Sequence, residues 1–506
     1  MSRLLLCGSV ITLLAACGTK APDTTNTAMA ATTTTASAGD AATADKIPVT
    51  SSSEEARTLF LRGQALADQL QLQDARQLFE QAAAKDPSFA MAHCNLALTA
   101  PTTKEFFAHL NEAVTLSDKA SKGERLLILA VQAGASADPA KALDYSEQLA
   151  AAYPGDERAH LQLGTAYFAR QQTEKSIDEF KKAVAINPDF SPVYNSLGYA
   201  YRQVGNYADA ETAFKKYIAL IPNNPNPYDS YGELLMKMGR LDESVTQYEK
   251  ALSIEPQFGS SRLGIADDRM YQGQTDESIA EAQKLYDAAR DDGDRRNARF
   301  NQAMTYVDAG DTEWALRAMA QERAMAIKIG DAGAESADVT AIGNILLNAG
   351  RTDEARAKFE EALKLLQGSN LSDDVKKDAA LADHYNMGRV ALAKGDLTTA
   401  KAEAAKYLSG ADARQNFFRL RQAHELNGMI ALRDKQYDQA IAELAQANQQ
   451  DPFALYVSAL AYRGKGDAAK AKDLFWQAAD MHILPTLNYV FVRTKAARYS
   501  QSQNPA

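Results

Sequence analysis

The residues in this sequence that could bind a metal or act as a general base are first of all its six histidines. A zinc-protease helix carries two histidines four residues apart, with a glutamate after the first. His424 is followed by Glu425, but position 428 is a glycine, so that motif is absent. His109 and His482 have no second ligand at helical spacing. A Gly-rich phosphate loop and a nucleophile elbow are absent as well.

Acidic side chains are the second group that could do chemistry. The chain has 65 Asp and Glu residues against 55 Lys and Arg residues, a formal net charge of -10. Two neighbouring carboxylates could serve general acid/base catalysis, but their proximity carries little weight in so acidic a chain. The net negative charge disfavours a nucleic-acid partner. We therefore predict a protein that is not an enzyme and that uses no cofactor, metal or nucleic acid.

The elements that position these residues follow from a motif repeated about every 34 residues. It is clearest in three copies that start at Glu157, Ser191 and Pro225, with Gly at position 8, a small residue at 20, an aromatic residue at 24 and Pro at 32. These residues are Gly164, Gly198 and Gly232; Ser176, Ala210 and Ser244; Phe180, Phe214 and Tyr248; and Pro188, Pro222 and Pro256. Small residues let two antiparallel helices approach closely, and the aromatic ring fills the adjoining gap. Each copy therefore predicts a helical hairpin.

Two other positions of the motif support this interpretation. Glycine recurs at position 15, as at Gly205, where the first helix must end in a left-handed residue. His93, His160, His384 and His424 all stand at position 4 of different repeats. We interpret them as packing residues in one structural position rather than as a metal site.

This pattern resembles the tetratricopeptide repeat. Twelve candidate units begin near Ala56, Ala90, Gly123, Glu157, Ser191, Pro225, Gly259, Arg296, Ser336, Leu381, Arg421 and Pro452. The resemblance implies an all-α, right-handed superhelical solenoid of about twelve helical hairpins. We expect a regular array over residues 54–258 and a looser array with longer units over 259–480. Residues 481–506 are expected to form a capping helix over the last hairpin and a tail.

The N-terminus predicts export and anchoring. Arg3 is followed by an apolar stretch from Leu4 to Ala16, too short for a permanent membrane span and suited to a secretory signal. Leu14-Ala15-Ala16-Cys17 resembles the lipobox of bacterial lipoproteins. The resemblance implies that residues 1–16 are removed, that Cys17 carries the lipid, and that Gly18 directs the protein to the outer membrane. The alternative is an ordinary signal peptide that ends near a cysteine.

The predicted anchor affects what the rest of the chain can do. If Cys7 is removed and Cys17 is lipidated, Cys94 is the only thiol left, which excludes an intramolecular disulfide and zinc sites built on paired cysteines. Residues 17–53 are rich in Ala, Thr and Ser, and we expect a disordered tether there. The protein would then face the periplasm or the cell surface.

A partner-binding groove is predicted along the first helices. In the repeat family, positions 2, 5, 9 and 12 of each first helix line the concave side, because that spacing forms one stripe of an α-helix. Here the candidate groove residues are Arg158, Phe168, Asn195, Tyr199, Arg202, Asn226, Asp229, Glu233, Asn344, Tyr385 and Arg389. The lysines of the chaperone-tail clamp known in the family are missing, and Asp229 and Glu233 would repel a terminal carboxylate.

Three functions are consistent with these predictions. The first is a lipid-anchored envelope scaffold that binds another envelope protein or a peptide in its groove. The second is a homo-oligomeric scaffold with contacts along the outer helices, although the sequence does not determine an oligomeric state. The third is an enzyme that acts on a glycan or peptide through groove carboxylates.

Overall fold

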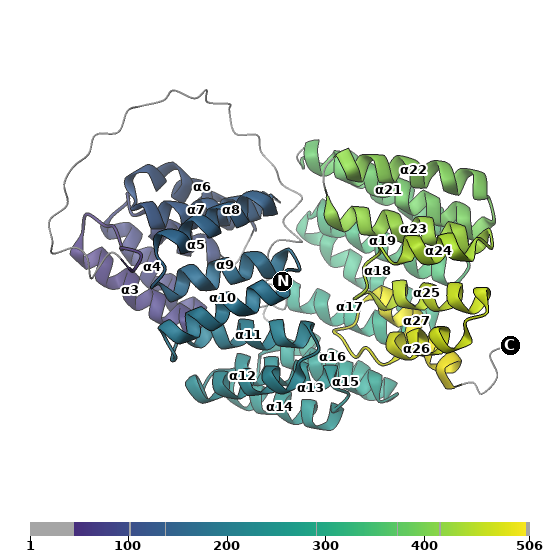
Figure 1. The fold of residues 1–506 in the computed structure, drawn as a ribbon, viewed down its shortest axis with the longest axis horizontal. Helices are drawn as coiled ribbons and strands as arrows, with labels where there is room; N and C mark the ends of the chain where they lie inside the picture. The colour runs from purple at the N-terminus through teal and green to yellow at the C-terminus, as the bar shows by residue number, and fades with distance from the viewer. Residues whose placement is uncertain are drawn as a thin grey trace. The chain divides into compact units, whose positions relative to one another are not determined.

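The chain folds into helices joined by short turns (Figure 1). The computed structural model describes residues 45–100, 103–136, 138–289, 291–371, 373–413 and 416–501, and no strand occurs among them. The predicted signal peptide, Cys17 and residues 18–44 lie outside this part of the chain. Because the described residues form helices and no strand, the predicted all-α class is confirmed.

Within the described residues, consecutive helices pair into twelve hairpins, as predicted, and one helix follows them. The pairs are α3 (Glu54–Asp68) with α4 (Leu72–Lys85), α5 (Ala90–Leu98) with α6 (Thr103–Leu116), α7 (Lys122–Ala135) with α8 (Pro139–Ala152), α9 (Glu157–Ala169) with α10 (Thr173–Ile186), α11 (Ser191–Gln203) with α12 (Tyr207–Leu220), α13 (Pro225–Lys237) with α14 (Leu241–Ile254), α15 (Gly259–Tyr271) with α16 (Thr275–Ala288), α17 (Asp292–Ala309) with α18 (Thr312–Ile329), α19 (Ala332–Asn348) with α20 (Thr352–Gln367), α21 (Asp373–Lys394) with α22 (Leu397–Ala413), α23 (Phe417–Arg433) with α24 (Tyr437–Leu444), and α25 (Pro452–Lys465) with α26 (Ala468–Ala479). A short 3-10 helix spans Ser117–Lys119, and α27 (Leu487–Gln501) ends the described chain.

Close helix contact depends on the glycine at position 8. A Cβ added at Gly63 would lie 2.7 Å from the ring of Phe79, and one added at Gly343 would lie 2.7 Å from the ring of Phe359. Any larger residue would separate the two helices of the hairpin or displace the aromatic ring. The predicted pairing of positions 8 and 24 therefore holds the hairpins together.

Three of the four histidines at position 4 pair with a glutamate of their own hairpin, whereas neither ring nitrogen of His93 has a hydrogen-bond partner in the described part of the chain. His160 Nδ1 lies 2.6 Å from Glu179 Oε2, and the equivalent distances are 2.6 Å for His384 to Glu403 and 2.8 Å for His424 to Glu443. In each case the glutamate lies in the second helix of the same hairpin. No group of three metal-ligating side chains occurs in the described part of the chain. These contacts agree with a structural role for the histidines.

The wider repeat spacing after Gly259 is due to longer helices. The helices α17 to α23 have 16 to 22 residues, whereas α9 to α16 have 13 or 14. The helix α21 begins at Asp373, before the predicted unit start at Leu381. The extra residues therefore extend the hairpins rather than their loops.

The last residues of the predicted tether, 45–53, lie against the hairpins. The backbone amide of Ile47 donates to Asp156 Oδ2 at 2.8 Å, that of Thr50 to Glu124 Oε1 at 2.8 Å, and that of Ser52 to Asp86 Oδ2 at 2.7 Å. All three carboxylates are buried. Side chains of the segment contribute as well, since the Ser51 hydroxyl donates to Asp86 Oδ2 at 2.7 Å and Lys46 pairs with Glu157. Composition did not reveal this segment, because its partners lie in hairpins far along the chain.

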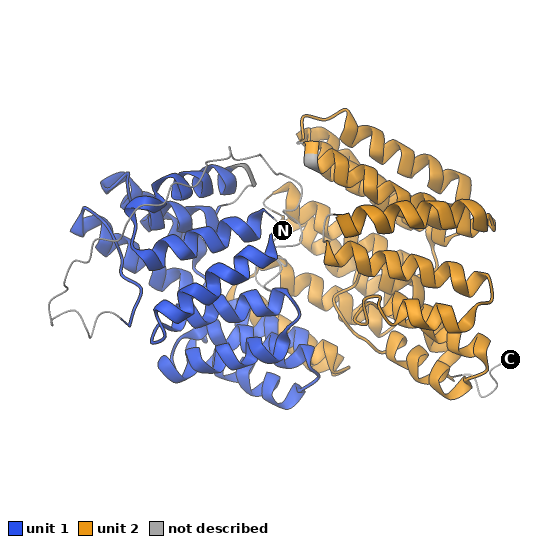
Figure 2. Cartoon of the chain, turned by 45° about the horizontal axis from the view of Figure 1, so that its top comes forward, with its two compact units in different colours: residues 1–234 blue, residues 235–506 orange. Residues whose placement is uncertain are grey.

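The chain divides into two compact units (Figure 2). Unit 1 comprises residues 1–234 and unit 2 comprises residues 235–506. In unit 2, α27 packs against α25 and α26 of the last hairpin, and it also contacts α17 and α19. Among the described helices, none is both long and apolar enough to cross a membrane.

Candidate functional site

We call the surface formed by positions 2, 5, 9 and 12 of the first helix of each hairpin the first-helix face. In unit 1 its centre is Glu233 on α13. The Tyr199 hydroxyl donates to Glu233 Oε2 at 2.9 Å, and Arg202 Nη1 donates to Glu233 Oε1 at 2.6 Å. The Arg202 guanidinium lies 4.7 Å from the centre of the Tyr199 ring. Arg202 thus balances the charge of the buried carboxylate, and Tyr199 donates a second hydrogen bond to it, both from the neighbouring hairpin.

Asn195 on α11 has an unusual environment on this face. Its side chain is buried, and its amide oxygen Oδ1 has no hydrogen-bond partner in the described part of the chain. Buried polar atoms are nearly always hydrogen-bonded, because leaving one unsatisfied costs free energy. The oxygen has almost no exposed surface, so it could accept a hydrogen bond from a ligand only after a covering group moves away.

The other predicted groove residues of unit 1 differ in their surroundings. Asn226 is buried, and its Oδ1 accepts a hydrogen bond from the Tyr217 hydroxyl at 3.1 Å. Phe168 packs against an apolar cluster that includes Phe180. Asp229 is also buried. Asn226 and Phe168 therefore contribute mainly to the hairpin interior.

Arg158 binds a segment of its own chain. Its Nη1 lies 2.9 Å from Asp68 Oδ1 in a two-pronged ion pair, and its guanidinium lies 4.9 Å from the centre of the Phe190 ring. Asp68 ends α3 and begins the turn to α4. The first hairpin therefore reaches the first-helix face of unit 1.

The turn 68–71 makes three further contacts beside Arg158, with residues next to the groove positions. The Ser191 hydroxyl donates to the Asp68 carbonyl at 2.9 Å, and Asn224 Nδ2 donates to the Gln69 carbonyl at 2.6 Å. The side chain of Leu70 packs against the same apolar cluster as Phe168. Sequence reasoning missed this contact. The only signal was Leu70 itself, which stands where most hairpins have glycine.

In unit 2 the predicted residues form a chain of polar contacts along α19, α21 and α23. Arg389 Nη1 donates to Asn344 Oδ1 at 2.7 Å, and the Tyr385 hydroxyl donates to Glu425 Oε1 at 2.8 Å. The Arg389 guanidinium lies 5.3 Å from the centre of the Tyr385 ring. The tyrosine, arginine and glutamate thus repeat the combination found around Glu233.

Glu425 differs from Glu233 in its titration. Burial and the nearby negative charge of Asp451 raise the pKa of Glu425 to about 7, against the opposing effects of Tyr385 and Arg389. Burial, together with the charge of Glu425, raises the pKa of Tyr385 well above its usual value. Glu425 therefore changes its charge near neutral pH.

The first-helix face of unit 2 is covered by α27. Asn488 Nδ2 donates to Asp451 Oδ2 at 2.9 Å, and Arg493 forms an ion pair with Asp308 of α17. Phe491 and Val492 are buried in the same apolar cluster as residues of α19 and α21. The helix is therefore part of the core of unit 2 as well as its cap.

A second buried ionic cluster lies among α17, α18 and α19. Arg296 forms a two-pronged ion pair with Asp338 at 2.8 Å and lies 3.3 Å from Glu322. Burial and the charge of Asp338 raise the pKa of Glu322 well above its usual value. One arginine thus faces two carboxylates, one of which favours the protonated form.

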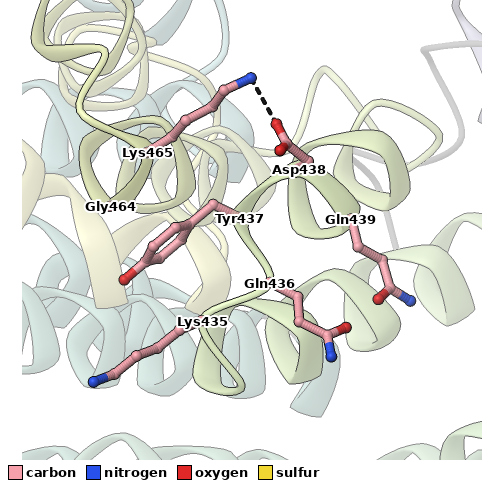
Figure 3. Close-up of a pocket in the computed structure, with 7 residues that line it drawn as sticks. All are labelled: Lys435, Gln436, Tyr437, Asp438, Gln439, Gly464 and Lys465. Atoms are coloured by element: carbon pink, nitrogen blue, oxygen red, sulfur yellow. Dashed lines mark ion pairs between the residues drawn. The ribbon is translucent and has the colours of Figure 1, made fainter.

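Figure 3 shows a surface pocket at the turn between α23 and α24. It is lined by Lys435, Gln436, Tyr437, Asp438, Gln439, Gly464 and Lys465. Lys465 pairs with Asp438 at 2.6 Å, and this hydrogen bond raises the pKa of Lys465. Burial likewise raises the pKa of the Cys94 thiol to about 12. The Lys465 amine and the Cys94 thiol therefore both stay protonated at neutral pH, and neither can act as a nucleophile there.

Comparison with known proteins identifies the repeats. Models described as TPR repeat or tetratricopeptide repeat match residues 60–116, 164–205, 191–224 and 226–258. A search of curated proteins finds no match.

Several solved structures are similar to this chain. A crystal structure of MamA is 24% identical, covers 30% of this chain and 90% of its own, and has a TM-score of 0.27. A tetratricopeptide repeat protein from Parabacteroides merdae is 16% identical over 54% of this chain and 94% of its own, with a TM-score of 0.34. The Cut9-Hcn1 hetero-tetramer of APC/C is 15% identical over 84% of this chain and 76% of that chain, with a TM-score of 0.40. The family matches therefore identify tetratricopeptide repeats within residues 60–116, 164–224 and 226–258, and such repeats imply a protein partner.

Proposed function

We propose that this protein is a lipid-anchored scaffold of the bacterial cell envelope that binds a protein or peptide partner through the first-helix face of unit 1. The observation that carries the binding site is the buried amide oxygen of Asn195, which has no partner in the described chain. An N–H group from a peptide would satisfy it. Arg202 lies on the same helix, and its partly exposed side chain can contact side chains of that peptide.

The proposed anchor rests on the sequence of the N-terminus. An apolar stretch precedes Leu14-Ala15-Ala16-Cys17, which resembles a lipobox, and Gly18 follows the cysteine. Several acyl chains on Cys17 would hold the protein stably at the membrane. On this proposal the protein resides at the outer membrane, with the repeats on its periplasmic or surface side.

The anchor is tested by fractionating cells that express Cys17→Ala. We expect the variant in the soluble fraction, because it cannot carry the lipid. If the variant stays with the membranes at the wild-type level, the proposed lipid anchor is wrong.

The binding site is tested by affinity capture from detergent-solubilised membranes, after cross-linking in intact cells. Asn195→Ala should reduce the yield of the captured protein at least fivefold, since it removes the acceptor. Thr212→Ala on the exposed side of α12, where the hydroxyl bonds only to its own helix, is the matched control and should capture like the wild type. Equal yields from both variants would contradict the site.

A second candidate function is supported by the two tryptophans. Trp314 on α18 and Trp476 on α26 are about half exposed, at 49% and 58%, and both lie on second helices. Large exposed apolar side chains are common in protein interfaces. A homo-oligomer with contacts along the outer helices would cover them. Light scattering that gives a monomer mass at all concentrations would exclude it, and Trp476→Glu should dissociate it.

A further inference from the structure

The turn 68–71 contacts the first-helix face of unit 1 in the manner of a bound peptide. Its Asp68 carboxylate pairs with Arg158, and its two carbonyls accept hydrogen bonds from Ser191 and Asn224. The apolar side chain of Leu70 packs against a cluster formed mainly by α10, α11 and α12. A charged anchor, main-chain hydrogen bonds and one apolar side chain are the elements by which proteins recognise short peptide motifs.

This contact is weakly held. The ion-paired side chains of Arg158 and Asp68 are 31% and 24% exposed, Leu70 is only half-buried, and Gln69 is exposed. Leu70 also has a φ of 58°, in the left-handed region that favours glycine. Partly exposed ion pairs contribute little, and a non-glycine residue in this conformation is strained. Another ligand could therefore displace the turn.

The turn also leaves one acceptor on this face unsatisfied. Ser191, which binds the turn, and Asn195 are four residues apart on α11 and so lie on the same side of the helix. The turn offers no hydrogen bond to Asn195 Oδ1, although that atom is buried. A partner that repeats the contacts of the turn and adds an N–H group at Asn195 would bind better than the turn itself.

We propose that the first-helix face of unit 1 recognises an acidic residue followed two positions later by an aliphatic residue, a pattern that Asp68 and Leu70 present from within the chain. A partner with the same pattern displaces the turn. The inference rests on the proposed function, because it names the chemistry of the partner that binds this face.

The test uses a fluorescein-labelled peptide with the sequence of residues 66–72 and the full-length protein in detergent. Leu70→Gly weakens the internal contact without disturbing the hairpin, because other hairpins have glycine at this position. By fluorescence anisotropy, the peptide should bind Leu70→Gly up to about fivefold more tightly than the wild type, since that factor corresponds to the loss of about 1 kcal/mol of internal contact. Lys435→Gly, the same change in the turn of a unit 2 hairpin, is the matched control and should bind like the wild type.

Two further variants test the contacts that carry recognition. The peptide with Asp68→Asn should bind Leu70→Gly at least fivefold more weakly than the unchanged peptide, because it lacks the charge that pairs with Arg158. Adding Arg158→Ala to Leu70→Gly should remove the gain in affinity. Equal binding of both peptides would overturn the acidic requirement.

Hydrogen exchange over residues 66–73 reports whether the turn is released. We expect faster exchange there in Leu70→Gly and in a second variant, Asp68→Asn. If exchange stays at the wild-type rate in both variants, or if the turn is released and the peptide does not bind, the inference is wrong. Loss of partner capture in Asn195→Ala would still support the proposed function, so the two failures are distinguishable.

Discussion

The two units cover their first-helix faces with different parts of the chain. Unit 1 uses the short turn 68–71, whose apolar side chain is half-buried. Unit 2 uses the whole of α27, in which Tyr489, Val490, Phe491 and Val492 are each less than 5% exposed. Because stabilisation grows with the apolar area buried, the same repeat geometry gives a replaceable contact in unit 1 and a permanent core in unit 2.

The charged contacts differ in the same direction. The Arg158 and Asp68 side chains are 31% and 24% exposed, whereas those of Arg493 and Asp308 are 15% and 7% exposed. Water screens the first pair, and the second is largely shielded from it. The difference teaches that the contact in unit 1 is the more readily displaced of the two, which supports the proposal that a partner binds there.

The largest loss of stability is expected from a substitution that leaves a cavity in the core of unit 2. Phe491→Ala removes a buried ring and should lower the free energy of unfolding of unit 2 by about 3–5 kcal/mol. Leu70→Ala, the corresponding change in unit 1, should cost about 1 kcal/mol or less, because half of the side chain stays in water. Hydrogen exchange in increasing urea measures both units in one experiment. Equal losses would remove the distinction between them.

The next largest loss of stability is expected from breaking the ion pairs. Arg493→Ala leaves Asp308 buried without its partner and should cost about 3–5 kcal/mol. Arg158→Ala breaks a partly exposed pair and should cost about 1 kcal/mol or less. Urea denaturation of the two variants provides the measurement, and a larger loss for Arg158→Ala would contradict the ranking.

A smaller effect is expected from pH. The pKa of Glu425 is raised to about 7, so the folded protein keeps a proton that the unfolded chain loses above its usual pKa of 4.5. The stability of unit 2 should therefore fall by up to about 1.4 kcal/mol per pH unit as pH rises from 4.5 to 7. Glu425→Gln should flatten this slope in denaturation curves taken across that range.

Unit 1 should respond to pH in the opposite direction. Burial by itself would raise the pKa of Asp86, but hydrogen bonds from Ser51, Ser88 and Ser52 hold it well below the usual 3.8. Its contribution to stability is present above that value and is lost on further acidification. In the wild type, residues 45–53 should lose protection from hydrogen exchange as the pH falls below 3.8. In Asp86→Asn this pH-dependent loss should be smaller.

The smallest effect concerns two turns. Gln171 and Lys435 have φ values of 58° and 60°, one in each unit, at the position where other hairpins have glycine. Replacing either by glycine relieves the strain and should raise the free energy of unfolding by about 1 kcal/mol or less. The melting temperature should rise slightly as a result. Leu70→Gly should not share this gain, because it also loses the contact with the first-helix face. A gain equal to that of Gln171→Gly would show that the contact contributes nothing.

Much of the fold could be predicted from local pattern. The close approach of Gly63 to Phe79 and of Gly343 to Phe359 depends on residues 16 positions apart within one hairpin. The histidine contacts follow in the same way, since His160 and Glu179 belong to neighbouring helices. Such contacts recur at fixed spacing, so a repeated sequence reveals them.

The site was predicted less completely. The groove stripe included Tyr199, Arg202 and Glu233, which the structure shows in contact with one another from adjacent hairpins. The stripe could not show that Arg158 is bound to Asp68, 90 positions away. No repeat spacing relates those two residues.

By itself, the sequence determined the helical hairpins, their number and the residues that hold each one together, because those interactions occur within one repeat or between neighbours. Only the tertiary structure decided what lies on the first-helix faces. The turn 68–71 and α27 reach hairpins far from their own in the chain. Their contacts depend on how successive hairpins curve around a common face, and that curvature arises from the packing of many small interfaces rather than from any local pattern.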